Sequence, residues 1–490
     1  MARSERPNIL IIMSDEHAPM FSGAYGHPLV QTPNMDRLAR QGTTFDAAYC
    51  NAPLCVPSRL SFMTGRFVSR CEGWDNATPL PSDAMTWPTL LRSVGYDAVL
   101  AGKMHLIGPD RLHGFREQLA FDPHGGGGHE NAATARRLGL SLKGRHAVHP
   151  WREGMPTAKE PWPSVSEARG GGGPMIEADD AIEAAALEYL RDPARKGGPF
   201  ALCVGFVAPH FPFVVPEPYF SMYYPDKTDM PDLPRGHLEN LPPAAQLLRQ
   251  AFGFHGYGDD QVLRARAAYY GLITYLDDKI GRLLDALHEQ GLAENTVVIH
   301  TSDHGESLGE HGLWRKMNFY EQAARVPLQI SWPGVLPGGR RVPDVVSLVD
   351  VTTTIVDLGE VPDDHSALWA MDGDSLLPLI QGDGAAWKDE AFVEHLAHGT
   401  DRARAMIRQG SWKLSYSHGD PPDLELYDLD TDPGEFTNLA GNPAHQQVQD
   451  RLLSRIMELW GDPDRLTHRI VASQEARLLI RQVAGDEAPF

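Results

Sequence analysis

The feature of this chain that most restricts its fold is an alternation of short apolar runs with helical segments. Runs typical of buried strands cover residues 8–13, 96–101, 200–206 and 296–301. Segments with helical spacing or helix-end signals cover residues 32–42, 86–94, 177–191 and 261–290. Helices between buried strands predict an α/β fold, with a mostly parallel sheet covered by helices on both faces. Such sheets bind ligands at the carboxyl ends of their strands.

The pattern changes in the last quarter of the chain. Short alternating runs predict antiparallel strands at residues 391–395, 403–408 and 411–416, and a helix is predicted at residues 443–459. We therefore expect a large α/β domain over residues 1–370 and a smaller α+β domain over residues 371–490. Residues 123–175 contain Gly-rich and Pro-containing stretches with neither pattern, and we expect them to form long loops around the site or a lid.

The charge balance excludes several kinds of partner. The 490 residues include 44 Lys and Arg against 65 Asp and Glu, which gives a net charge of −21. Such a chain repels nucleic acid and anionic membranes, so an anionic ligand needs a local basic pocket. Four cysteines are too few for a disulfide framework, and no apolar stretch approaches the ~18 residues of a membrane span. The first apolar run is too short for a signal peptide, so we expect a cytoplasmic protein, alone or as a homo-oligomer.

Acidic side chains follow two of the expected strands. Asp15 and Glu16 come after the first strand, and Asp303 and His304 follow residues 296–301. The carboxyl ends of parallel strands meet at one edge of a sheet, so these side chains can supply oxygen and nitrogen ligands to one divalent cation. Taken alone, an Asp after a strand is usually a helix cap or a loop residue.

A cysteine stands at the expected start of a helix. In the segment Asn51-Ala52-Pro53-Leu54-Cys55-Val56-Pro57-Ser58-Arg59, the positive end of the helix and Arg59 would favour an anionic or nucleophilic group at Cys55. The alternative is a buried structural thiol, which is how we interpret Cys50, Cys71 and Cys203.

The segment Cys55-x-Pro57-Ser58-Arg59, followed by Thr64-Gly65-Arg66, resembles the signature of sulfatases, in which a formylglycine-generating enzyme oxidises the cysteine to formylglycine. Further segments match in the same order along nearly the whole chain, namely Asp15, 102–105, 208–210, 303–306, 309–312, Lys316 and 425–433. The resemblance implies the alkaline-phosphatase superfamily fold. Residues 75–77, 102–110 and 112–115 are most similar to choline-sulfatase-like members.

Two departures bear on the substrate. His304 stands where many sulfatases have Asn, and the His form occurs in choline sulfatases and phosphonate monoester hydrolases. The characteristic choline-sulfatase tail is not evident in residues 474–490. We therefore expect hydrolysis of small alkyl or aryl sulfates, without a preference for choline sulfate. Two alternatives stay open: a phosphonate monoester or phosphodiester hydrolase with the same site, and an inactive binding protein with unconverted Cys55.

The resemblance also implies a role for each matched residue. A divalent cation, Ca²⁺ first and Mg²⁺ or Mn²⁺ otherwise, would be held by Asp15, Glu16, Cys55, Asp303 and His304. Arg59 would orient the hydrated formylglycine, and His105 would act as the base that helps the covalent intermediate collapse. The residues that would meet the small-molecule sulfate ester are Asn76, Lys103, His210 and Lys316, the last two beside the leaving oxygen.

Overall fold

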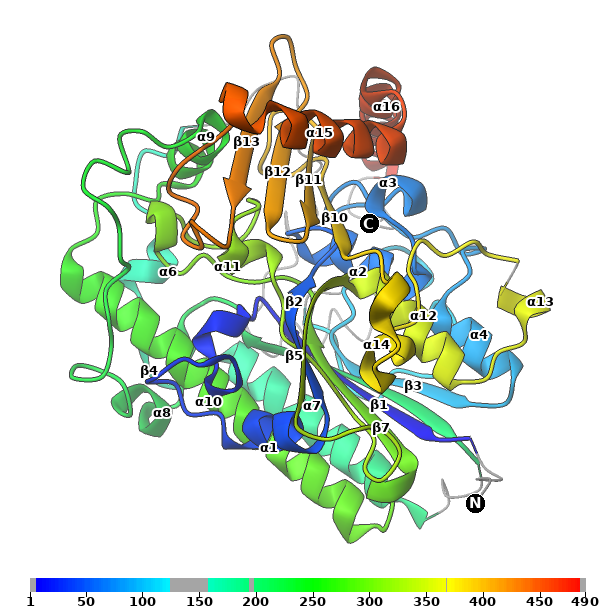
Figure 1. Ribbon diagram of the computed structural model, residues 1–490. Helices are drawn as coiled ribbons and strands as arrows, with labels where there is room; N and C mark the ends of the chain where they lie inside the picture. Colours follow the sequence, from blue (N-terminus) through cyan, green and yellow to red (C-terminus); the bar gives the residue numbers. More distant parts are fainter. Residues whose placement is uncertain (1–5, 124–156, 194–197, 367, 485–490) are drawn as a thin grey trace.

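The structure is a computed structural model that describes residues 6–123, 157–193, 198–366 and 368–484 (Figure 1). Its centre is a seven-stranded sheet in the order β3-β5-β1-β7-β8-β2-β9. These strands are β3 (Asp97–Gly102), β5 (Phe200–Pro209), β1 (Asn8–Asp15), β7 (Thr296–Ser302), β8 (Leu328–Ser331), β2 (Thr43–Tyr49) and β9 (Arg340–Ser347). Only β8 runs antiparallel to its neighbours, so the predicted mostly parallel sheet is confirmed.

Helices cover both faces of this sheet, as the alternation predicts (Figure 1). One face carries α1 (Pro33–Gln41), α7 (Pro174–Arg191) and the long α10 (Asp259–Glu289). The other carries α2 (Cys55–Thr64), α4 (Trp87–Ser93) and α12 (Leu348–Leu358).

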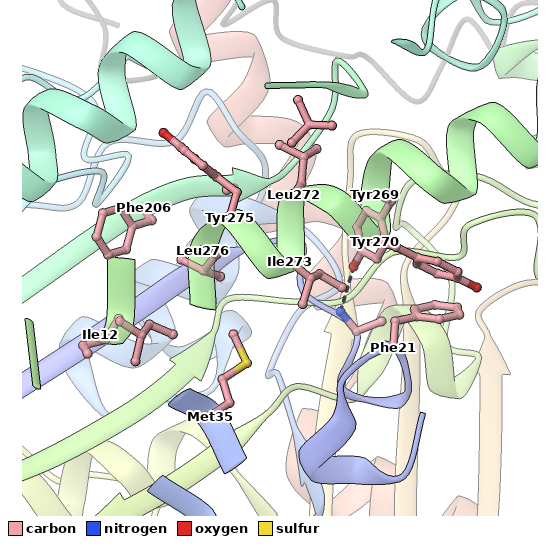
Figure 2. Close-up of a cluster of buried hydrophobic side chains, with 14 of the residues drawn as sticks. Ile12, Phe21, Met35, Phe206, Tyr269, Tyr270, Leu272, Ile273, Tyr275 and Leu276 are labelled. Carbon is pink, nitrogen blue, oxygen red and sulfur yellow. Dashed lines mark hydrogen bonds between the residues drawn. The ribbon is translucent and has the colours of Figure 1, made fainter. Parts of the chain in front are cut away.

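Residues of β1 show why the sheet is buried on both sides. Leu10 and Ile12 belong to the core under α10, whereas Ile9 and Ile11 belong to the opposite core. This division follows from the alternation of side chains along a strand. Figure 2 shows Ile12 in the first core, with Phe206 of β5 and Leu276 of α10 nearby. The apolar runs predicted as strands are therefore continuous because both faces are covered.

The C-terminal part forms a four-stranded antiparallel sheet of β10 (Glu390–His395), β11 (Arg404–Gln409), β12 (Trp412–Ser417) and β13 (Asp423–Asp428). Helix α15 (Gln446–Trp460) packs on β11 and β12, and α16 (Pro463–Ala484) follows it. The three predicted strands and the helix are confirmed; β13 and α16 were not predicted. The division at residue 370 stays a prediction.

Shorter elements connect these layers. The remaining strands and α-helices are α3 (Val68–Cys71), α6 (Pro163–Ser166), β4 (Arg169–Gly170), β6 (Val214–Val215), α8 (Glu217–Ser221), α9 (Pro243–Phe252), α11 (Glu321–Ala324), α13 (Asp363–Ser366) and α14 (Leu377–Gln381). Single 3₁₀ turns are η1 (Pro19–Phe21), η2 (Gly23–Tyr25), η5 (Ala293–Asn295), η6 (Glu310–Gly312), η7 (Gly384–Ala386) and η8 (Pro443–His445).

The loops predicted at residues 123–175 fall mostly outside the described residues, because 124–156 are not described. The described remainder holds α6, β4 and the start of α7. Among the helices that the structure describes, none combines the length and hydropathy needed to cross a bilayer.

Candidate active site

Four neighbouring parallel strands end at one edge of the large sheet, and each is followed by a candidate residue. Asp15 ends β1, Asp303 follows β7, His210 follows β5 and Lys103 follows β3. In the register of β1 and β7, Ser14 stands opposite Ser302, which brings Asp15 beside Asp303. The sequence prediction that the strand ends meet is therefore confirmed.

The turn after β3 depends on two glycines. Gly102 has φ +87°, a conformation that side chains rarely adopt, and it allows the Lys103 N–H to bond the carbonyl of Gly205, 2.8 Å away. A Cβ on Gly205 would collide with the backbone of Lys103. The close approach of β3 and β5 thus aims Lys103 into the edge of the sheet.

Asp15, Cys55, Asp303 and His304 form a buried group whose ligand atoms all lie within 4.8 Å of one another. His304 Nε2 lies 3.2 Å from Cys55 Sγ and 3.6 Å from Asp303 Oδ1. Asp15 Oδ1 is buried and accepts no hydrogen bond from any described residue. Carboxylate oxygens with one imidazole nitrogen suit a hard divalent cation, and the bare Asp15 oxygen is the kind of atom that such an ion would satisfy.

Glu16 lies between this group and the other basic residues. Its Oε2 accepts a hydrogen bond from Lys316 Nζ at 3.0 Å and lies 3.2 Å from His210 Nε2. Glu16 also forms a second possible metal-binding group with Asp15 and His210. The backbone of Glu16 has φ +65°, so the chain turns sharply where β1 ends.

Arg59 holds the carboxylates of the site together. Its Nε donates to Asp303 Oδ2 at 2.8 Å, and its Nη2 lies 3.3 Å from Asp15 Oδ2. The third contact runs from Nη1 to the Lys103 carbonyl at 2.9 Å. Lys103 Nζ also forms an ion pair with Asp15. Arg59 lies one turn after Cys55 in α2, so the helix that carries the cysteine is anchored to the sheet edge.

Burial and neighbouring charges shift the pKa values of the site residues. Burial would raise the pKa of Asp15, but Lys103 and Arg59 hold that pKa well below its usual value. Burial raises the pKa of Glu16 to about 8 and that of the Cys55 thiol to about 11. An unmodified Cys55 is therefore a neutral thiol at pH 7, and so a weak nucleophile.

Burial and neighbouring charges also shift the pKa values of His304, His210 and Lys316. Burial lowers the pKa of His304, which keeps its ring neutral and able to bind a metal. Burial also lowers the pKa of His210 well below its usual value, helped by Lys316 and Lys103. Burial would lower the pKa of Lys316, but the neighbouring acidic groups, Asp15 among them, raise it above its usual value. Lys316 is thus a permanent cation beside the cysteine.

Asn76 lies at the start of the cysteine helix. Its Oδ1 accepts a hydrogen bond from the Val56 N–H at 3.0 Å, within the first turn of α2. The preceding Asp75 is buried and ion-pairs with Arg477 of α16. The chain end therefore supports the segment that carries Asn76.

His105 follows Lys103 after β3. It is buried with φ +55°, and its N–H donates to Asp122 Oδ2 at 2.6 Å. Asp122 also accepts from the N–H of Met104 at 3.0 Å, so it positions this turn. Sequence reasoning missed Asp122, which stands at the border of the segment without a pattern.

Two further residues near the site received no role from the sequence. Glu306 Oε1 accepts the N–H groups of Leu308 and Arg315, at 2.8 and 2.5 Å. Arg315 directly precedes Lys316, and that adjacency was the available signal. The other cysteines, Cys50, Cys71 and Cys203, are buried and free, in agreement with their structural interpretation.

The sulfatase family profile matches residues 7–361, about three quarters of the chain. The chain belongs to the sulfatase family. A second profile, for the C-terminal region of N-sulphoglucosamine sulphohydrolase, matches residues 309–462. The resemblance inferred from the cysteine signature is therefore confirmed, and the protein is a sulfatase-family hydrolase that acts on sulfate esters.

Individual relatives cover nearly the whole of this sulfatase. A choline-sulfatase of Rhizobium meliloti is 34% identical over 446 residues, which is 89% of this chain and 83% of the relative. The multifunctional alkaline phosphatase superfamily protein PehA of Trinickia caryophylli is 30% identical, over 90% of this chain and 92% of the relative. The crystal structure of a phosphonate monoester hydrolase of Agrobacterium radiobacter superposes with a TM-score of 0.72 at 26% identity, over 93% of this chain and 95% of that one.

Proposed function

We propose that this sulfatase hydrolyses small-molecule sulfate esters with a formylglycine made from Cys55 and with one divalent cation. The observation that carries the proposal is the position of Cys55, at the start of α2 and within 4.8 Å of ligand atoms from Asp15, Asp303 and His304. The hydrated aldehyde carries two hydroxyls on one carbon. One would attack sulfur and displace the alcohol; the other would then lose its proton, which re-forms the aldehyde and releases sulfate.

A divalent cation at this group would act as a Lewis acid and neutralise sulfate oxygens. Asp15, Cys55, Asp303 and His304 would hold it, with Glu16 at the border of the group. Two or three carboxylates with a single imidazole favour Ca²⁺, with Mg²⁺ or Mn²⁺ as alternatives.

Side chains of the protein would bind the sulfate group, position residue 55 and act on the leaving oxygen. Lys103 and Lys316 bring positive charge to the sulfate oxygens, and Asn76 adds a hydrogen bond. Arg59 fixes Asp15 and Asp303 and so holds the residue at position 55 in place. His210 and Lys316 both contact Glu16, which places an imidazole and a cation together beside the leaving oxygen. His105 serves as the base that helps the covalent intermediate collapse.

The proposal also includes a location and a partner. Cys50, Cys71 and Cys203 are free and buried, which is compatible with the reducing cytoplasm. A formylglycine-generating enzyme in the same compartment would modify Cys55 before or during folding, because the folded chain buries that side chain.

The test is to express the chain with and without a formylglycine-generating enzyme and to weigh the peptide that contains Cys55. Conversion lowers its mass by about 18 Da. Turnover of an alkyl sulfate should rise with the converted fraction and should disappear with a chelator. Converted, metal-loaded protein that hydrolyses no sulfate ester would overturn the proposal. Unconverted Cys55 despite the modifying enzyme would favour an inactive binding protein.

A phosphonate monoester or phosphodiester hydrolase is the second candidate. His304 favours it, because the His form at this position is shared with phosphonate monoester hydrolases, whose fold superposes on this chain. The ratio of kcat/KM for matched phenyl sulfate and phenyl phosphonate esters decides between the two. A ratio above one supports the sulfatase assignment, and a ratio below about 0.01 would reverse the order of the candidates.

A further inference from the structure

Arg315 lies next to Lys316, one of the two residues that the proposed function puts beside the leaving oxygen. It directly precedes Lys316, and its backbone has φ +65°. The neighbouring Lys316 bonds Glu16, and the Arg315 N–H donates to Glu306, so Arg315 lies at the border of the site. Arg315 is partly exposed as a residue, although its Nε is buried.

Three aromatic rings surround this guanidinium. Its carbon lies 4.7 Å from the ring centre of Phe211, 4.9 Å from that of Phe252 and 5.6 Å from that of Trp162. All three rings are partly exposed. An aromatic box of this kind attracts a cation, and here the chain's own side chain occupies it.

Phe211 contacts both the Arg315 guanidinium and the two residues proposed to act on the leaving oxygen, His210 and Lys316. Its ring stacks on His210, with 4.0 Å between ring centres, and Lys316 Nζ lies 5.2 Å from the same ring. An alcohol that leaves past His210 and Lys316 would therefore meet Phe211 and Arg315 next.

The guanidinium has no carboxylate partner among the described residues. None of their carboxylate oxygens lies within 4.0 Å of it, and its buried Nε makes no hydrogen bond with any of them. Of the nearby carboxylates, Glu306 bonds backbone N–H groups through Oε1 and Glu16 bonds Lys316 through Oε2, and neither forms an ion pair with the guanidinium. Aromatic rings attract the charge but accept no strong hydrogen bonds, so the planar fork of donors remains available to an oxyanion.

We propose that Arg315 binds an anionic group, a carboxylate or a second sulfate, on the alcohol portion of the substrate. The preferred substrates are then sulfate esters with a second negative charge. Choline sulfate is disfavoured, because its quaternary ammonium would meet a cation already seated in the aromatic box. This inference rests on the proposed function, since it takes His210 and Lys316 to mark the leaving-group side.

The test compares esters of one length with the converted enzyme. 4-Sulfooxybutanoate should have a kcat/KM at least about tenfold above that of its neutral amide, as expected for a partly buried ion pair with Arg. Choline sulfate should fall below its uncharged isostere, 3,3-dimethylbutyl sulfate. A carboxylate-to-amide ratio near one in the wild type would overturn the inference.

Variants of Arg315 test whether the preference for the carboxylate over the amide depends on this side chain. In Arg315→Met the carboxylate-to-amide ratio should fall to within about twofold of one, and in Arg315→Lys part of it should return, because a point charge remains without the fork. The ratio compares two substrates in the same preparation, so loss of folded protein cancels. Arg249→Met is the matched control: Arg249 lies in α9 with Phe252 and bonds the Gly312 carbonyl at 3.1 Å. A ratio that Arg315→Met leaves unchanged would also overturn the inference.

Binding separates this inference from the proposed function. The Kd of 4-sulfooxybutanoate for the Cys55→Ala protein, relative to that of the amide, should show the same preference of about tenfold without any turnover. If no sulfate ester is hydrolysed but this preference is present and is lost in the double variant with Arg315→Met, the proposed function fails and the inference stands. If sulfate esters are hydrolysed but the carboxylate is not preferred over the amide, the proposed function stands and the inference about Arg315 fails.

Discussion

Two regions of the molecule bury charged side chains, and they do so differently. The sheet-edge cluster consists of Asp15, Glu16, Lys103, Asp303 and Lys316, all buried. The Lys413 cluster consists of Glu321, Lys413 and Glu435 and connects α11 to the C-terminal sheet.

In the Lys413 cluster each charge has a partner from the protein. Lys413 Nζ lies 3.0 Å from Glu321 Oε1 and 2.6 Å from Glu435 Oε1. The Glu321 N–H donates to Glu435 Oε2 at 2.8 Å, and the Tyr49 hydroxyl donates to Glu321. These contacts pair both carboxylates with Lys413, so the cluster holds α11, β2 and β12 together.

In the sheet-edge cluster, Asp15 belongs to two groups of possible metal ligands, one with Cys55, Asp303 and His304 and one with Glu16 and His210. Asp15 Oδ1 and Glu16 Oε1 are buried without a hydrogen bond from any described residue, and ligand atoms of Cys55 and His304 lie nearby. Buried charge alone therefore does not mark a functional site. A group of possible metal-ligand atoms beside a cysteine, with the bare Asp15 oxygen among them, does indicate one, because leaving such an atom bare is costly unless something binds there.

The largest expected effect is the loss of activity when Cys55, beside the sheet-edge cluster, is replaced. Cys55→Ala removes the proposed nucleophile and should lower kcat by at least about 10⁴-fold, and Cys55→Ser should recover little because Ser is not a hydrated aldehyde. Multiple-turnover assays measure this, and unfolding curves should match the wild type within about 1 kcal/mol. Cys203→Ala, in β5, is the control and should keep its activity. Normal turnover by Cys55→Ala would remove the basis for treating this cluster as catalytic.

The next effect concerns the stability of the Lys413 cluster. Lys413→Met leaves two buried carboxylates without their cation and should lower the free energy of unfolding by about 3–5 kcal/mol. Urea unfolding measures the change, and kcat per folded molecule should stay near the wild-type value. A large loss of kcat in protein that is still folded would show that the two clusters are coupled.

A third change tests the metal. Asp303→Asn removes one negative ligand while keeping the size of the side chain, so metal affinity and kcat should fall together by about a hundredfold. Metal content of the purified variant and its turnover are measured side by side. A full equivalent of metal with normal turnover would reduce Asp303 to its other role, as acceptor for the N–H groups of Glu16 and His304.

The smallest expected effect is a pH dependence in the Lys413 cluster. Burial raises the pKa of Glu435 from about 4.5 to about 7, even beside Lys413. The folded state then holds this proton more tightly than the unfolded state, so the contribution of Glu435 to stability falls as pH rises from about 4.5 to about 7.

Gln cannot lose a proton, so Glu435→Gln lacks this dependence. The free energy of unfolding of the variant, minus that of the wild type, should increase between pH 5 and 8 by on the order of 1–3 kcal/mol. Urea unfolding of both proteins across that range gives the difference directly. A flat difference would mean that the carboxyl is ionised in the folded state throughout the range.

Much of the fold could be read from local patterns. The four central strands, five helices and three strands of the C-terminal sheet were predicted, because apolar periodicity reports directly on burial. Strands β2, β8 and β9 were missed. Strand β2 contains Asp46, β8 has only four residues and β9 contains Pro343, so their strand character depends on the neighbours they pair with.

What the sequence by itself determined is the chemistry available to the sheet edge: the cysteine signature, and the Asp and His residues that directly follow predicted strands. Only the tertiary structure decided how these groups share their contacts. It placed Glu16 between Lys316 and His210, seated Arg315 among Phe211, Phe252 and Trp162, and paired Asp75 with Arg477, 402 positions away. Such contacts join segments far apart in the chain, and the free energy that selects them comes from packing and burial rather than from any local pattern.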